Sequence, residues 1–143
     1  MQKMIAAILL CLCAADLWSH EVINSAEAPR AVGPYSQAIQ AGNTVYLAGQ
    51  IALDPATGTY TPASIQDETR RVLNNLRAVL QAAGLDLAHL VSTTVYLADL
   101  DDFAAMNAAY AEFFTDAAPA RATIEAARIP GGAKVEISAI AVR

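Results

Sequence analysis

The chain has 143 residues, of which 55% are hydrophobic and 16% are charged. It is therefore long enough to bury a core, yet no longer than one ordinary domain. Its formal net charge is −5, which leaves no basic stripe to neutralise a run of phosphates and argues against avid nucleic-acid binding. Small ligands are the better expectation.

Cysteine and histidine are scarce in this sequence. The only cysteines, Cys11 and Cys13, lie near the N-terminus, so the rest of the chain has no disulfide, thiolate nucleophile or cysteine metal ligand. The two histidines, His20 and His89, are far apart, and His89 falls in a predicted surface connection. Without a carboxylate cluster they do not suggest a metal site, and we expect none.

The N-terminus has two interpretations. Residues 1–3 carry a positive charge, residues 4–13 are apolar, and residues 13–15 resemble a cleavage site, as in a secretory leader. The apolar run is too short to span a bilayer stably. The alternative is an extension from a mis-assigned start codon. Either way, residues 1–20 stand apart, and residues 21–143 are predicted to form a single domain.

The first half of that domain predicts a β-hairpin followed by a helix. Residues 38–40 and 44–51 are short apolar runs, and the Ala-Gly-Asn sequence at 41–43 is a turn signal between them. From Ser64 the apolar residues recur at helical spacing, with Ser64 as the expected N-cap. Gly84 is the expected end of this helix.

The second half predicts a strand, a helix and a closing strand. Residues 90–97 are rich in β-branched side chains, and Asp99 or Asp101 is placed to cap a second helix. Arg121 opens a further probable strand, and residues 135–142 form a closing strand that is apolar on both faces. The apolar face of the second helix is expected to contain Phe103, Met106, Tyr110 and either Phe113 or Phe114.

The order β-β-α-β-α-β predicts an α+β domain with two helices on one face of a mixed sheet. A closing strand that is apolar on both faces needs cover on both, and two helices cover only one. The second face therefore indicates oligomerisation through the sheet.

Two charged residues in the last third of the chain stand inside apolar sequence. The planar fork of Arg121 suits bidentate recognition of a carboxylate. Glu136 shares a strand face with Ser138 and Ile140, where apolar surroundings would raise its pKa and make it a proton shuttle near neutrality. The alternatives are a surface arginine after a helix and an exposed edge glutamate.

Two further residues have two open interpretations each. Asn107 falls close to the apolar face of the second helix, where its amide either ties helix to sheet or contacts a ligand. Tyr35 follows the turn signal Gly33-Pro34, which would aim its ring. Aromatic residues held in this way line pockets or pack into the core.

Taken together, residues 21–143 resemble the RidA/YjgF family of reactive-intermediate imine deaminases. Several segments match the family in order and spacing, which is more specific than any single motif. The matching segments are APRAVGPYSQA at 28–38, AGQIALDPATG at 48–58, VLNNL at 72–76, TTVYL at 93–97, FAAMNAAY at 103–110, PAR at 119–121 and VEI at 135–137.

This resemblance implies a chorismate-mutase-like fold assembled as a barrel-like homotrimer, with three clefts at the subunit interfaces and no cofactor. It implies hydrolysis of enamine or imine acids, such as 2-aminoacrylate/2-iminopropanoate and 2-iminobutanoate, to 2-keto acids and ammonia. By position, Arg121 would bind the substrate carboxylate and Glu136 would activate the attacking water. Tyr35, Gly49 and Asn107 would line the cleft.

The chain departs from many relatives at Thr123, where a cysteine is common; a backbone contact to substrate would survive this change. Two other functions stay open. One is a non-catalytic module that binds small carboxylates or protects proteins as a chaperone. The other is the ribonuclease or translation-inhibitor activity attributed to some relatives, which the acidic balance disfavours. The resemblance implies a cytoplasmic protein, whereas a working leader would make it periplasmic or secreted.

Overall fold

The computed structural model describes residues 20–143, so the two cysteines and all but the last residue of the predicted leader lie outside the described part. Within it, no helix is both long and apolar enough to cross a membrane. The elements in chain order are β1 (Glu21–Ile23), β2 (Ala38–Ala41), β3 (Thr44–Gln50), α1 (Ile65–Ala82), β4 (Leu90–Leu97), α2 (Phe103–Ala111), β5 (Ala120–Glu125) and β6 (Val135–Val142).

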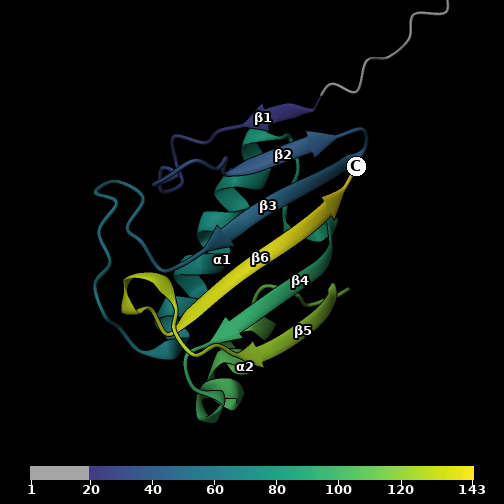
Figure 1. Cartoon of the computed structure of the whole chain (residues 1–143). Helices are drawn as coiled ribbons and strands as arrows, with labels where there is room; N and C mark the ends of the chain where they lie inside the picture. The colour runs from purple at the N-terminus through teal and green to yellow at the C-terminus, as the bar shows by residue number, and fades with distance from the viewer. Residues whose placement is uncertain (1–19) are drawn as a thin grey trace, which may run out of the picture.

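The strands form one mixed six-stranded sheet in the order β1-β2-β3-β6-β4-β5. All neighbouring pairs are antiparallel except β4 and β5, which run parallel. Both helices lie behind the sheet in Figure 1, and no helix of residues 20–143 covers the face towards the viewer. The predicted α+β fold, with two helices on one face of a mixed sheet, is confirmed.

The predicted hairpin and first helix are present, with the expected local chemistry. Gly42 takes a positive φ of 59° in the turn between β2 and β3. The side chain of Ser64 accepts a hydrogen bond from the backbone N–H of Asp67 and so caps α1. At the other end Gly84 has a φ of 71°, and the N–H of Leu85 donates to the carbonyl of Leu80, which is a Schellman ending.

Two strands add to the predicted order. β1 has only three residues, too few to show the two-residue alternation of a strand in the sequence. It forms by pairing its backbone with the edge of β2. The strand expected to open at Arg121 is β5, which begins one residue earlier, at Ala120, because its backbone already pairs there with Ser92 of β4. The sheet is therefore wider than the sequence pattern indicates.

The second helix also differs in detail from the prediction. The side chain of Asp99 accepts from the N–H of Asp101 and caps a short 3-10 turn, Leu100–Asp102, which leads into α2. Met106 and Tyr110 are buried as expected, but Phe103 is 41% exposed. Phe103 is the first residue of α2 and is not part of the buried core, so the burial expected of it was wrong.

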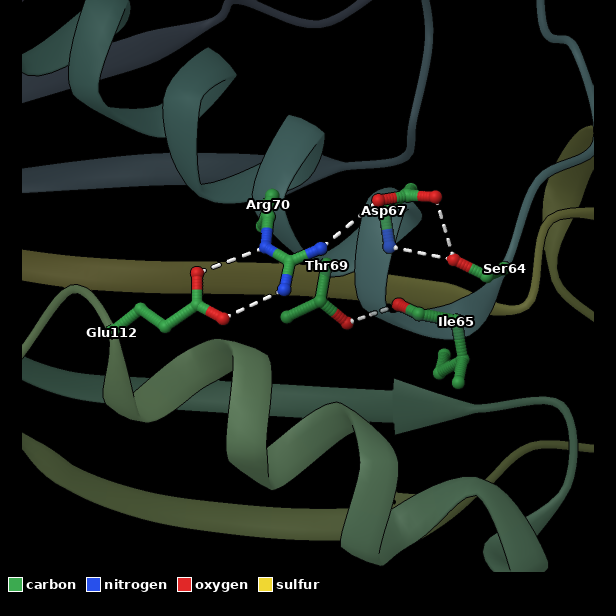
Figure 2. A network of polar contacts seen from close by, with 6 residues as sticks. All are labelled: Ser64, Ile65, Asp67, Thr69, Arg70 and Glu112. Atoms are coloured by element: carbon green, nitrogen blue, oxygen red, sulfur yellow. Dashed lines mark hydrogen bonds and ion pairs between the residues drawn. The ribbon is translucent and has the colours of Figure 1, made fainter.

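An ion-pair network joins the two helices on the surface (Figure 2). Arg70 of α1 donates from Nε and Nη2 to the two carboxylate oxygens of Glu112, just after α2, at 2.9 and 2.7 Å. Its Nη1 donates to Asp67 at 2.9 Å. All three side chains are well exposed, so this network orients α2 against α1 more than it stabilises the fold.

A buried carboxylate connects three distant segments. Glu68 of α1 is 1% exposed. One of its oxygens accepts from the Tyr60 hydroxyl at 2.6 Å and from the Ala63 N–H at 3.3 Å, and the other accepts from the Lys134 N–H at 2.9 Å. Burial, followed by the bond to Glu68, raises the pKa of Tyr60 to about 12, so its hydroxyl keeps its proton. Glu68 thus anchors the segment that leads into β6.

We expect Glu68→Ala to lower the free energy of unfolding by about 3 kcal/mol, because it leaves buried donors without an acceptor. The measurement is urea unfolding at fixed protein concentration. The matched control is Glu27→Ala, which removes an exposed glutamate whose carboxylate accepts no hydrogen bond from the described residues. Equal midpoints for the two variants would contradict the anchoring role of Glu68.

Candidate functional site

Arg121 lies on the helix-covered face of the sheet. In the parallel register of β4 and β5 it pairs with Thr93, and Thr123 pairs with Val95. Thr93 and Val95 are both buried against the helices, and side chains of paired residues point to the same face. Arg121 and Thr123 therefore face α2 from the edge strand, each half-buried.

The guanidinium of Arg121 is held by residues of α2. Its Nη2 donates to Oδ1 of Asn107 at 2.7 Å. Its central carbon lies 4.6 Å from the ring centroid of Tyr110 and 5.8 Å from that of Phe103. Asn107 thus ties helix to sheet through Arg121, which is the first of its two interpretations.

A cavity of about 320 Å³ opens beside this arginine. Besides Arg121 and Asn107, its lining is formed by Tyr110, Ala111, Phe114, Ala118 and Pro119. Most of these side chains are apolar, and the guanidinium is the only cation among them. Apolar surroundings strengthen an arginine's attraction for a small anion, because the effective dielectric constant beside them is lower than in bulk water.

Glu136 lies on the opposite, uncovered face. Along β6 its neighbours Val135 and Ile137 are buried against the helices, while Glu136 alternates with them and is half-buried. It accepts no hydrogen bond from the described residues. Burial raises the pKa of the Glu136 carboxyl above its ordinary value, as the sequence pattern predicted. A carboxyl group of this kind suits proton transfer closer to neutral pH.

Gly49 makes room for that carboxylate. A Cβ at this position would overlap Oε1 of Glu136 and lie 2.9 Å from its carboxyl carbon. The register of β3 against β6 also shifts between Leu47 and Gln50. A β-bulge is therefore present at Gly49, and the space beside it holds a side chain of the predicted site.

A larger cavity of about 560 Å³ surrounds Glu136 and Gly49. Tyr35 lines it from the loop before β2, where Gly33 has a φ of 137° and the Tyr35 N–H donates to the Gly33 carbonyl at 2.9 Å. The Tyr35 hydroxyl accepts from the Val32 N–H at 3.3 Å, so the ring folds back over its own turn. The other lining residues are Pro29, Arg30, Ala31, Val32, Gln37, Ala48, Gln50, Ile51, Leu53 and Pro130.

Gln37 holds the loop that carries Tyr35, and sequence reasoning missed it. It is 3% exposed. Its Oε1 accepts from the Ser25 N–H at 2.6 Å, and its Nε2 donates to the carbonyls of Ser25 and Pro29 at 3.2 and 2.7 Å. The signal was a glutamine directly before an apolar strand, where a buried amide needs several partners.

The structure therefore places most of the predicted site residues in two groups. Tyr35, Gly49 and Glu136 line the larger cavity, whereas Asn107 and Arg121 line the smaller one. Thr123 lines neither of these two cavities. The two charged residues project from opposite faces of the same sheet. A ligand held by the Arg121 of one chain does not reach the Glu136 of that chain.

His89 has a structural role. It ends a short 3-10 turn, and its ring nitrogen Nδ1 accepts from the N–H of Asp86 at 3.1 Å while the Asp86 side chain accepts from the N–H of Leu87. Within residues 20–143, no three His, Cys, Asp or Glu side chains gather as a metal site would require.

Comparisons with known proteins show the family of this chain. The family model described as Endoribonuclease L-PSP matches residues 25–143. A RutC family protein of Pyrococcus horikoshii is 50% identical over 86% of this chain and 98% of its own length. The 2-iminobutanoate/2-iminopropanoate deaminase of Mus musculus is 46% identical over 86% of this chain and 91% of its own length. A crystal structure of Escherichia coli TdcF with bound serine is 41% identical, with a TM-score of 0.82, over 86% of this chain and 98% of that one. The chain belongs to the endoribonuclease L-PSP family, which is the RidA/YjgF family expected from its sequence.

Proposed function

We propose that this protein is a hydrolytic deaminase that converts 2-imino acids, such as 2-iminopropanoate and 2-iminobutanoate, to 2-keto acids and ammonia. The observation that carries the proposal is that one chain presents both an oriented arginine and a half-buried carboxyl group of raised pKa, each lining its own cavity. The arginine suits the carboxylate common to these substrates. The carboxyl group suits proton transfer to and from water.

The proposed site is shared between two copies of the chain. Arg121 and Glu136 lie on opposite faces of one sheet, so they act on one substrate only if they come from different chains. The uncovered face offers exposed apolar side chains for such assembly, among them Tyr46, Ile124 and Val142. The family resemblance extends this to a homotrimer with one cleft at each of three interfaces, each containing Arg121 of one chain and Glu136 of its neighbour.

The reaction needs only a modest rate enhancement from the protein, because imines already hydrolyse in water. Arg121 binds the carboxylate and so fixes the imine carbon beside a water molecule held by Glu136. The water oxygen bonds to this carbon while Glu136 takes the water's proton. Glu136 passes that proton to the imine nitrogen, which gives a carbinolamine. It then moves the hydroxyl proton to the amino group, the carbonyl forms as the carbon–nitrogen bond breaks, and ammonia leaves with the keto acid. Asn107 keeps the arginine aligned, and Tyr35 and Gly49 shape the wall.

A second candidate function is binding of small carboxylates without turnover. The observation that favours it is the bound serine in the related TdcF structure, since serine is a small carboxylate and not an imine. The same arginine would serve both functions. The family model takes its description from a ribonuclease activity, but a net charge of −5 disfavours binding to a polyanion.

Arg121→Ala is expected to lower kcat/KM for 2-iminobutanoate about a hundredfold, because it removes charge-assisted hydrogen bonds to the carboxylate. The imine is generated in situ by a threonine dehydratase, and keto-acid release above the uncatalysed rate is followed. The matched control is Arg128→Ala, which removes an exposed arginine outside both cavities. Oligomeric state should be unchanged in both variants; dissociation of Arg121→Ala would contradict a role confined to binding.

Glu136→Gln is expected to keep carboxylate binding but to lower kcat by two to four orders of magnitude, because the amide cannot accept the water's proton. In the wild type, kcat should fall as pH drops through the raised pKa of Glu136, since protonation removes the base. Rates are compared with uncatalysed hydrolysis at each pH. An unchanged kcat in the variant, or the same acid limb in both proteins, would refute the role of Glu136.

Gly49→Ala is expected to lower kcat roughly tenfold to a hundredfold while the melting temperature changes little. The new methyl group displaces the Glu136 carboxylate, which is the movable end of a side chain, and small misplacements of a catalytic group are costly. Steady-state kinetics and a thermal melt are run in parallel. Full activity in this variant would show that the position of Glu136 does not limit the reaction.

A further inference from the structure

The aromatic support under Arg121 is itself fixed by a buried hydrogen bond. The hydroxyls of Tyr110 and Thr93 lie 2.9 Å apart, and both residues are buried. Thr93 is also the residue that pairs with Arg121 across β4 and β5. One strand position therefore borders the arginine directly and holds the ring against which its guanidinium packs.

This arrangement restricts the guanidinium from two sides. The ring of Tyr110 lies 4.6 Å from its central carbon and limits the tilt of its plane. The hydrogen bond from Nη2 to Asn107 limits its rotation within that plane. Nη1 and Nε donate no hydrogen bond to the described residues, so both stay available to a ligand.

A simple packing role for Tyr110 does not explain its hydroxyl. The ring already packs against Phe114, with centroids 4.7 Å apart, and a phenylalanine would fill the same space. Burying two hydroxyl groups in an apolar region costs free energy of desolvation. The hydrogen bond between them offsets this cost but adds little net stability. Burial raises the pKa of Tyr110, so this hydroxyl keeps its proton at neutral pH and is always able to donate. What the bond provides is a fixed ring position.

We propose that Tyr110, held by Thr93, is the positioning residue that sets the plane of the Arg121 guanidinium and thereby the affinity of the site for the substrate carboxylate. This inference rests on the proposed function, in that Arg121 is taken to bind the carboxylate. It adds a determinant of affinity that acts through the orientation of the arginine.

The test is a double-mutant cycle with a ligand-binding readout. Tyr110→Phe, Thr93→Val and the double variant are compared with the wild type for the dissociation constant of 2-ketobutyrate, by calorimetry, and for KM and kcat with 2-iminobutanoate. We expect each single variant to raise the dissociation constant and KM about threefold to tenfold, with a smaller change in kcat. The double variant should be no weaker than the weaker single variant, because the two hydroxyls act as one unit.

Tyr110→Leu separates positioning from packing. It should raise the dissociation constant at least tenfold, because no ring remains beneath the guanidinium. Melting temperatures are recorded for every variant, and the Arg121 Nε–H resonance, which reports the ring above or below it, should move in Tyr110→Leu. Lower melting temperatures with wild-type affinity and an unmoved resonance would overturn the proposal and leave Tyr110 a packing residue.

The two proposals fail differently. If the wild type binds 2-ketobutyrate through Arg121 but does not hydrolyse imines, the deaminase function falls, while the affinities of the variants still decide the positioning role. If imines are hydrolysed and the variants bind as the wild type does, only the positioning role falls. If the wild type binds no carboxylate at all, both are overturned.

Discussion

The alternation of side chains along β6 is the constraint on which the rest of the structure depends. This strand is hydrogen-bonded to β3 on one side and to β4 on the other, so it cannot rotate about its own axis. Val135, Ile137, Ala139 and Ala141 pack against the helices. Because the period of a strand is two residues, Glu136 is then forced onto the other face. A shift of one residue would bury the carboxylate in the core.

The same rule places Arg121 on the helix side. Its parallel pairing with Thr93, which is itself buried beneath α2, leaves the arginine no other face. Each charged group thus meets conditions that suit it. The cation packs against aromatic rings and an amide oxygen, whereas the carboxylate sits over a glycine in a half-buried cavity. Keeping them on separate faces prevents an ion pair within one chain that would occupy both groups.

Much of the remaining polar architecture holds these two positions in place. Glu68 anchors the segment that begins β6, and Gln37 anchors the loop that brings Tyr35 to the cavity of Glu136. Both are buried side chains with several backbone donors or acceptors, and such groups are costly to leave unpaired. They act at a distance from the proposed chemistry, through loops that have little core of their own.

Sequence alone determined the hairpin, the two helices, the closing strand and the α+β class, because each of these depends on local periodicity, caps and turns. It also singled out Arg121, Glu136 and Asn107 as charged or polar residues within apolar sequence, and Tyr35 as an aromatic residue after a turn, whereas Gly49 came from the family resemblance. It did not reveal β1, the exposure of Phe103 or the anchoring amide of Gln37, which depend on contacts between distant segments. Only the tertiary structure decided that Arg121 and Glu136 lie on opposite faces, because the relative facing of two strands is set by their hydrogen-bond register, and register is a property of the assembled sheet.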